Sequence, residues 1–502
     1  MSRGTAEVET DARARADERA RRLPIGVTAA YAAGAAIDGV MSNALNVFIL
    51  FYLTSVCGVS AISAGAALAV GLAVDAVADP LLGALSDGWR SPLGRRLPPM
   101  LCGLPVALVA FALIFSLPAR LDGSAQISVL AVLSIALRIG VSMFNLPYLA
   151  VGAELSDDHD VRSRIMTWRW GFNMIGALVA IALGFGVFFR GANGIARPGA
   201  YPWFAVTLDV VALAAAAVAM AAIFATRGRQ HLPNRRGRSL VRTLYAEFRE
   251  VFASHSFRVL FFGAILFFVS QGVTLSLGLH TNRYFWRLDA GETEQVTLAY
   301  FAGLLVGAPL AGPIVKRIER RTALFVGIGG LALAQGGPAA LRLSGLLPLE
   351  GGHLAWLLAG VLACGGAFMS MAAIAFMSMM ADAADEHEHL YGTRREGLYF
   401  AGWAFAGKAA HGAGTLIAGL ILQLIGFPSM TAGEISPADL SPHTVEALGF
   451  FYGPAAAALA LLGTVVLRWY RLDRATHRSV LAALHLRRRD IMVKCAAAEV
   501  GR

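Results

Sequence analysis

Charged residues and cysteines are scarce in this chain of 502 residues. Only 15% of the residues are Asp, Glu, Lys or Arg, whereas 57% are hydrophobic. That balance excludes an ordinary soluble protein, a fibre or a disordered chain. The four cysteines lie far apart and form no Cys-x-x-Cys pair, so neither a zinc site nor a disulfide framework is expected.

We expect no cleavable leader in this chain, and the motifs of soluble enzymes are not found in the sequence. The first 22 residues are polar, and the apolar stretch after them is too long for a signal peptide. Glycine-rich runs such as 327–330 lie inside apolar stretches and indicate close helix packing rather than a phosphate-binding loop. What is present is a series of apolar stretches, each long enough to cross a hydrocarbon layer of ~30 Å. The sequence therefore predicts an all-α, polytopic membrane protein.

Apolar windows bounded by charged, proline or glycine residues predict twelve membrane-spanning helices in two sets of six. The predicted spans are 25–53, 61–86, 98–118, 125–152, 166–189, 203–226, 257–281, 296–315, 322–343, 353–380, 396–426 and 446–470. An arginine-rich polar stretch separates the sets. The expected division is an N-terminal tail (1–24), a six-helix bundle (25–226), a linker (227–256), a second six-helix bundle (257–470) and a basic C-terminal tail (471–502).

The basic residues are concentrated in the two tails and in every second loop. Of the 43 Lys and Arg residues, those in the opposite loops are only Arg120, Arg190, Arg197, Arg283, Arg287 and Arg342. Because cytoplasmic loops carry an excess of Lys and Arg, we expect both termini and the linker on the cytoplasmic side of the inner membrane. The net charge of +10 then reflects topology and does not indicate a nucleic-acid partner.

A few ionisable residues lie inside predicted spans, where each costs on the order of 3 kcal/mol. Asp75 and Asp79 are four residues apart and share one face of the second helix. Two carboxylates at that spacing repel unless a cation or a shared proton neutralises them. The pair therefore predicts a cation-coupling site, with neutralisation by Arg or Lys from other helices as the structural alternative.

Buried cations are available to these carboxylates and to a polar ligand. The set comprises Arg138, Arg169 and Lys408, facing Asp38, Asp75 and Asp79. Arg169, flanked by two tryptophans, combines a planar donor with aromatic faces and suits a sugar, although it would equally serve to tie helices together. Lys408, with Trp403 before it and His411 after it, marks the corresponding region of the second half. His280 and Asp209 are weaker candidates nearer the membrane interfaces.

Three segments together resemble one transporter family. Residues 75–96 resemble the second-helix signature of the glycoside, pentoside and hexuronide cation symporters, the melibiose-permease-like branch of the major facilitator superfamily. Residues 145–155 with Arg169 resemble the fourth and fifth helices of that family, and residues 380–400 with Lys408 resemble its cytoplasmic loop between helices ten and eleven. The resemblance implies the major facilitator fold and alternating access driven by cation and solute.

The resemblance also implies roles for individual residues. Asp75 and Asp79 match the cation-binding carboxylates, and Arg169 and Lys408 match polar residues near the sugar and cation sites. The residues that match the cytoplasmic gating motif are Gly83, Asp87, Arg90, Gly94, Arg95 and Arg96. The residues expected to form the charge network of the second half are Asp382, Asp385, Glu388, Arg394, Arg395 and Glu396.

Departures from the family pattern bear on ion and substrate. Ala78 stands where the melibiose permeases carry an amide, which removes an oxygen ligand for sodium and favours protons. The family's first-helix sugar-binding acid aligns with Gly39, one position after Asp38, and its fourth-helix acid is Asn145 here. Trp403 replaces a glutamine. We expect a remodelled substrate site that includes Asp38, Asn145, Arg169, Trp403 and Lys408.

The function expected from these features is secondary active symport of a sugar or glycoside with H⁺, or less favourably Na⁺. A lysolipid or another amphipathic solute is the alternative within the family. An alternative of another class is an intramembrane magnesium-dependent prenyltransferase, suggested by the two Asp-rich segments. We expect no enzymatic activity, no cofactor, no metal beyond sodium at Asp75 and Asp79, and a monomer within the lipid bilayer.

Overall fold

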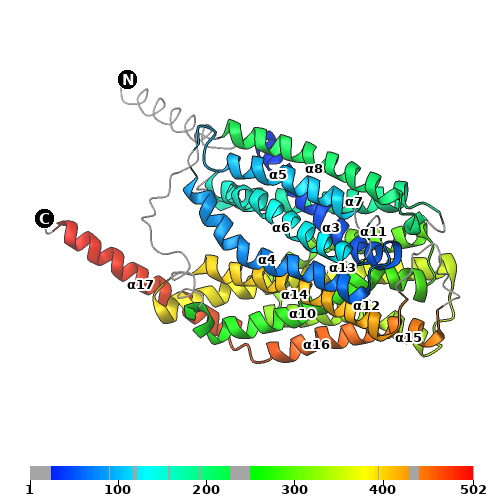
Figure 1. The fold of residues 1–502 in the computed structure, drawn as a ribbon. Coiled ribbons are helices and arrows are strands. Elements are labelled where there is room, and N and C mark those ends of the chain that lie inside the picture. Colours follow the sequence, from blue (N-terminus) through cyan, green and yellow to red (C-terminus); the bar gives the residue numbers. More distant parts are fainter. Residues whose placement is uncertain are drawn as a thin grey trace, which may run out of the picture.

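The computed structural model describes residues 24–89, 91–116, 121, 123–155, 159–191, 194–226, 249–393, 395–428 and 440–500, whose regular elements are all helices (Figure 1). The first set comprises α2 (Ile25–Ala33), α3 (Ala35–Phe51), η1 (Tyr52–Val56), α4 (Ala61–Gly88), α5 (Leu97–Ile114), α6 (Gly123–Glu154), α7 (His159–Leu183), η3 (Gly184–Phe188), η4 (Gly194–Ala196) and α8 (Ala200–Ala225). The second comprises α10 (His255–His280), η6 (Thr281–Phe285), α11 (Ala290–Arg317), α12 (Arg320–Leu343), α13 (Gly351–Tyr391), α14 (Glu396–Leu424), α15 (Pro442–Phe450), η7 (Phe451–Ala455), α16 (Ala456–Leu467) and α17 (Arg474–Val500).

The apolar helices agree with the predicted spans. Within the described residues, eleven helices are long and apolar enough to cross a membrane, and the apolar part of α4, Ala61–Asp75, occupies the position of the second predicted span. Their ends carry recognisable start signals. Ser60 accepts a hydrogen bond from the Ser63 N–H at the start of α4, and Asp289 forms a capping box with Glu292 at the start of α11.

Helix α13 is longer than the apolar pattern predicts. Its 41 residues continue eleven positions beyond 380, through a run of Ala, Asp, Glu and His, and end where Gly392 takes a φ of +76°. Asp382, Asp385 and Glu388 were expected in a loop and lie instead on this helix. The prediction was wrong because hydropathy marks where a helix leaves lipid, and not where its hydrogen bonding ends.

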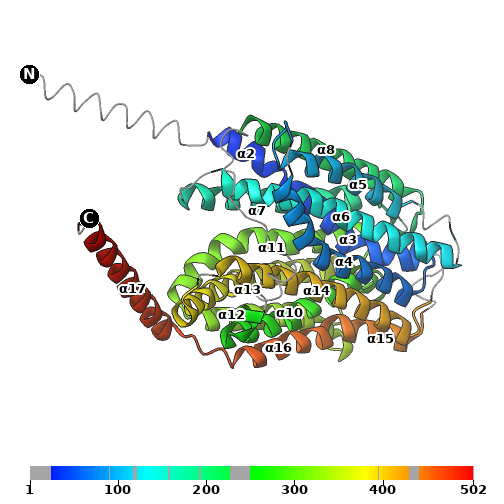
Figure 2. The ribbon, with the colours of Figure 1, turned by 60° about the vertical axis from the view of Figure 1, so that its left-hand side comes forward.

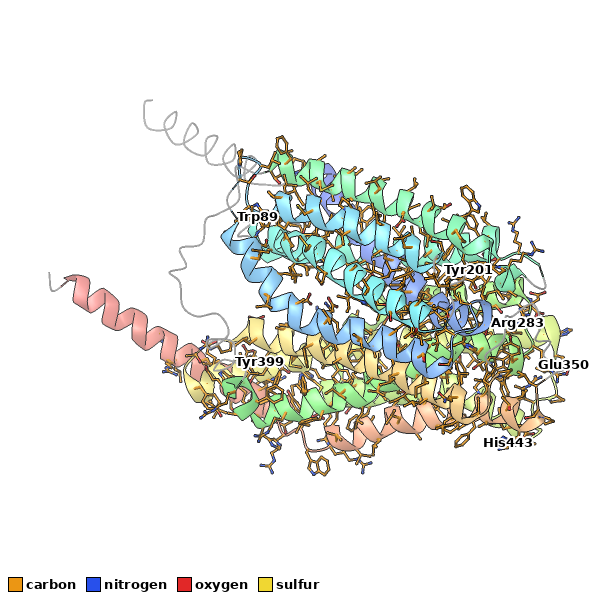
Figure 3. All side chains as sticks on the ribbon, in the orientation of Figure 1. Trp89, Tyr201, Arg283, Glu350, Tyr399 and His443 are labelled. Carbon is orange, nitrogen blue, oxygen red and sulfur yellow. The ribbon has the colours of Figure 1, made fainter. Side chains whose placement is uncertain are left out.

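The helices form two groups that lie side by side (Figures 1 and 2). Within the first group α3 packs on α7, and α4 and α5 pack on α6, while in the second group α10 packs on α14 and α11 and α12 pack on α13. Figure 3 identifies the two ends of the molecule: Trp89 and Tyr399 lie at one end, and Arg283, Glu350 and His443 lie at the other. We call the first end, where α2 begins and α17 projects, the terminal side, and we call the other end the far side.

The two groups touch on the far side. Helices α4 and α14 approach so closely that a Cβ built on Gly419 would lie 2.3 Å from the Ala61 carbonyl oxygen. Nearby, the Thr54 hydroxyl lies 2.9 Å from Nε2 of His280, and both residues are buried. The His280 ring packs between Phe51 of the first group and Phe427. This contact closes the molecule on the far side.

Candidate functional site

Lys408 of α14 connects the two aspartates of α4. Its ammonium nitrogen lies 3.0 Å from Oδ2 of Asp75 and 2.5 Å from Oδ2 of Asp79. The Ser142 hydroxyl of α6 donates a hydrogen bond of 2.6 Å to the other oxygen of Asp75, whose side chain is 4% exposed. A single cation from the second helix group thus lies between two carboxylates of the first.

The charges around this triad do not balance. Arg138 of α6 interacts electrostatically with Asp75, Asp79 and Asp38, so three carboxylates share two cations. In addition, Oδ1 of Asp79 is buried and has no hydrogen-bond partner among the described residues. An unbalanced negative charge is costly in a medium of low dielectric constant. The cluster can therefore accept one proton or one monovalent cation, and the buried, unpaired Oδ1 of Asp79 is the atom available to receive it.

Asp38 belongs to the same charge cluster but is held by its own helix group. Its carboxylate accepts hydrogen bonds from the Ser42 hydroxyl at 2.8 Å and from the Asn173 amide at 3.0 Å. Asn173 lies on α7, so the contact fixes α3 against α7. Asp38 also lies near Asp75 and Asp79, because all three aspartates interact electrostatically with Arg138.

Arg169 packs inside the first helix group. Its guanidinium lies over the Tyr148 ring at 4.8 Å and donates to the Met166 sulfur at 3.3 Å. Tyr148 in turn donates to the Tyr31 carbonyl at 3.0 Å, which ties α6 to α2. The adjacent Trp170 lines the central cavity, whereas Arg169 is not among the lining residues.

Trp403 and Asn145 are also set back from the cavity lining. Trp403 packs between Phe268, at a ring separation of 5.0 Å, and Phe376, at 4.9 Å. Asn145 is half-buried on α6. Neither residue is among those that line the cavity, so the structure does not bring them together with the polar groups described next.

A cavity of about 890 Å³ lies between the two helix groups. Its lining includes five amide side chains, namely Asn43, Asn46, Gln271, Asn282 and Gln335. His411, one turn after Lys408 on α14, lines it as well and connects the cavity to the cation cluster. The amides are absent from the predicted site residues because they are uncharged, whereas charge marks a residue inside a span as functional. The signal that would have found them is any Asn or Gln within an apolar window.

The cavity is closed on the far side and exposed on the terminal side. The lining residues toward the far side, such as Asn282 at 8% and Val296 at 2%, are buried. Those toward the terminal side are open, with Met166 42% exposed and Met377 48% exposed. A solute would therefore reach the amides from the terminal side in this conformation.

A cavity between two helix groups with a charge cluster beside it is the arrangement of a secondary transporter. Residues 30–474 match the family model described as MFS/sugar transport protein. The chain belongs to this MFS/sugar transport family. It is 25% identical to an uncharacterized symporter of Synechocystis sp., over 94% of this chain and 98% of that protein. It is also 25% identical to the isoprimeverose transporter of Lactiplantibacillus pentosus, over 86% of this chain and 85% of that protein.

The fold of this MFS transporter matches solved structures at low sequence identity. The crystal structure of the nucleoside transporter NupG superposes with a TM-score of 0.60 at 9% identity, over 89% of this chain and 99% of that chain. The membership and the fold confirm the predicted major facilitator architecture. They also show that the prenyltransferase alternative is wrong, because the family and its relatives are transporters.

The residues expected to form a gating motif lie at the terminal end of α4 and just after it. Gly94 takes a φ of +87°, which favours glycine, and lets the chain turn back to Arg95, which is half-buried, and Arg96. Arg96 is buried and donates to the Ser86 hydroxyl at 3.2 Å. Gly83 has open space around it. Of the remaining expected members, Arg90 and the side chain of Asp87 lie outside the described residues.

The charge network of the second half is assembled on α13. Asp382 forms an ion pair with Arg320 of α12, and Nε2 of His477 on α17 lies 3.1 Å from Asp385 and 3.5 Å from Asp382. The network therefore recruits two residues that the resemblance did not indicate, Arg320 and His477. Glu388 and Glu396 are half-buried nearby, and Arg394 lies outside the described residues.

Arg395 makes its contact with the segment that precedes α10. Its guanidinium lies 3.0 Å from the Glu250 carboxylate, which also accepts a hydrogen bond from Thr393 at 2.9 Å. The Arg395 guanidinium lowers the pKa of Glu250 below its usual range. His387 lies 3.3 Å from the same carboxylate. The end of the expected linker is thus fixed to the second helix group.

Proposed function

We propose that this transporter carries out cation-coupled symport of an uncharged sugar or glycoside, with H⁺ favoured over Na⁺. The observation that carries the proposal is the Lys408 ammonium, which belongs to one helix group and lies between two carboxylates of the other. Any change in the charge of that triad alters a bond between the two halves. Cation binding is therefore coupled to the relative movement of the halves.

The coupling follows from the charge balance. The formal charge of Asp38, Asp75, Asp79, Arg138 and Lys408 is −1, so one bound cation makes the cluster neutral. A proton or Na⁺ on Asp79 competes with Lys408 for the carboxylate and weakens the bridge to α14. When the cation is bound, the protein can change to its other conformation without an unbalanced charge in the low-dielectric centre of the membrane.

The choice of a proton rests on the oxygen atoms at hand. Sodium requires several oxygen ligands, whereas a proton needs one acceptor. The side-chain oxygens described around Lys408 are those of Asp75, Asp79 and the Ser142 hydroxyl, and Ala78 supplies none. The unpaired Oδ1 of Asp79 offers a single acceptor.

The choice of an uncharged, hydroxylated solute rests on the cavity. Among the described residues its lining is made of amides, hydroxyls, aromatic rings and apolar side chains, with His411 as the one imidazole and with no carboxylate, Lys or Arg. Amides both donate and accept hydrogen bonds, as sugar hydroxyls require. A relative named as an isoprimeverose transporter supports this choice. The headgroup of a lysophospholipid would find no charged partner among these lining residues.

We further propose the placement in the membrane that the basic residues predict: an inner-membrane monomer with both termini and the terminal side of the cavity facing the cytoplasm. The two helix groups over 25–226 and 257–470 serve as the two moving bodies. Residues 1–23 of the expected tail 1–24 and most of the linker lie outside the described residues.

The test is solute-triggered pH change in energy-depleted vesicles that contain the purified protein, with and without sodium. An uncharged sugar or glycoside should drive proton influx, and Asp79→Asn should abolish it. Asp209→Asn, a matched change of a half-buried aspartate on α8, should retain it. Accumulation of solute against a gradient by the Asp79→Asn protein would refute the assigned role. Sodium-dependent uptake without a proton signal would change the ion alone.

A further inference from the structure

The cavity has two chemically different ends. Its amides lie from the middle of the helices toward the far side: Asn43 and Asn46 on α3, Gln271 on α10, Asn282 on η6 and Gln335 on α12. The hydroxyl-bearing residues Thr274 and Thr297 line the cavity on the same side. Gln271 and Gln335 exchange reciprocal hydrogen bonds of 3.3 and 3.2 Å, so their amides are held in a fixed orientation.

The other end of the cavity is mostly apolar, with Thr167 on α7 as a hydroxyl in its lining. The four methionines in the lining, Met166, Met174, Met369 and Met377, lie from the middle toward the terminal side. They come from α7 and α13, which belong to different helix groups and both line the cavity. Pro309 and Ile374 continue this surface. Methionine is flexible and polarisable, and it accommodates apolar groups of varied shape.

Resting on the proposed function, we propose that the solute is a glycoside with an apolar substituent, bound with its sugar toward the far side and its alkyl or aryl group toward the cavity mouth. Only the deep end supplies enough donors and acceptors for a ring of hydroxyls. A second sugar at the mouth would leave hydroxyls unpaired against methionine, which costs binding free energy. An alkyl group there is removed from water at no such cost.

The volume of the cavity agrees with this assignment. About 890 Å³ lies near the upper end of the usual range for small-molecule pockets, which is roughly 300–1,000 Å³, so a bare monosaccharide would leave the mouth unfilled. A competing explanation of the methionines is that they pack against each other when the mouth closes in the opposite conformation. That explanation predicts no dependence of binding on the substituent.

The experiment measures binding of methyl, ethyl, propyl and butyl glycosides to the purified transporter by calorimetry, in glucoside, galactoside and xyloside series below their micelle concentrations. Each fully buried methylene should tighten binding about fourfold, so the three methylenes that distinguish butyl from methyl should tighten it about 60-fold. Butanol alone should not compete. A butyl-to-methyl ratio below about twofold in every series that binds overturns the inference and leaves sugar symport intact.

Variants separate the two explanations of the methionines. Met377→Ser should reduce the butyl-to-methyl ratio at least threefold, and Met166→Ser on the opposite helix group should do the same if the first variant fails to fold. Leu333→Ser, on a side chain of α12 that is 73% exposed and does not line the cavity, should keep the wild-type ratio. If Met377→Ser weakens methyl and butyl glycosides by the same factor, the methionines serve closure and the inference is wrong. If no glycoside of any series binds, the proposed sugar function fails as well.

Discussion

Thr54→Val tests whether one hydrogen bond holds the far side closed. The Thr54 hydroxyl lies 2.9 Å from Nε2 of His280, across the contact between the helix groups, and both side chains are buried there. Valine keeps the shape of threonine and removes the hydroxyl, so the imidazole nitrogen loses its partner only in the closed state. When the halves separate, water replaces the hydroxyl. An unsatisfied buried nitrogen costs about 1–3 kcal/mol, which shifts the equilibrium toward the far-side-open state by about 5-fold to 150-fold.

The assay uses a single cysteine in the cavity. The four native cysteines are replaced by serine and Asn46→Cys is introduced, because Asn46 lines the part of the cavity that the closed contact covers. A membrane-impermeant maleimide is then added from the far side in intact vesicles. The labelling rate should rise by the same 5-fold to 150-fold factor in Thr54→Val, since labelling follows the fraction of open molecules.

The double variant Thr54→Val with His280→Phe provides the matched control. Phenylalanine replaces the imidazole by an apolar ring that packs on Phe51 and Phe427, so no unsatisfied nitrogen remains. Replacing both partners of a buried hydrogen bond by apolar groups is nearly neutral, and labelling should return close to the parent rate. The reasoning is refuted if Thr54→Val labels at the parent rate, or if the double variant labels as fast as the single one.

Three further changes have defined outcomes. Ser142→Ala removes the hydrogen bond to Asp75 and should destabilise the detergent-solubilised protein by about 1.5–3 kcal/mol, lowering its thermal midpoint by several degrees; an unchanged midpoint would show that Asp75 has another donor. Gly419→Ala places a methyl group 2.3 Å from a carbonyl oxygen of α4 and should raise far-side labelling as Thr54→Val does, whereas slower labelling would contradict the role of α4–α14 packing. Because the pKa of Glu250 is lowered, its contribution to docking the linker is present above the usual glutamate pKa of about 4.3 and is lost as the pH falls through the lowered value. Pepsin should therefore cut the linker faster as the pH falls below about 4, and Arg395→Ala should already speed tryptic cleavage at pH 7; equal tryptic rates would refute the docking.

The spans could be predicted from sequence because lipid imposes a simple rule on them. A stretch of about 20 apolar residues has few alternatives to a membrane helix, and the predicted spans lie at the helices of the structure. Where the solvent changes, the rule fails. Helix α13 continues past residue 380 because alanine, glutamate and histidine remain compatible with a helix in water.

The charge cluster of Asp75, Asp79 and Lys408 could be predicted for a related reason. Asp75, Asp79 and Lys408 are conspicuous because charge is costly in lipid, and their pairing follows from the need to offset that cost. The direction of a side chain around its helix is harder to predict. Arg169 and Trp170 are adjacent in sequence, yet only the tryptophan reaches the cavity lining. The amides carry no charge and do not interrupt an apolar window, so the cavity could not be predicted from the sequence.

Because α13 is long, a small tilt of the helix moves its end over a large distance. Its 41 residues extend about 60 Å, and the last eleven, about 16 Å, continue beyond the end of the apolar stretch at residue 380. A tilt of about 10° about its far end would carry its tip roughly 10 Å sideways. The segment beyond residue 380 bears Asp382 and Asp385, which contact His477 in the first turn of α17. Small rotations inside the membrane are thereby turned into large displacements at the aqueous surface, where a pair of spectroscopic labels on α17 and α4 would record each transport cycle as a change in distance.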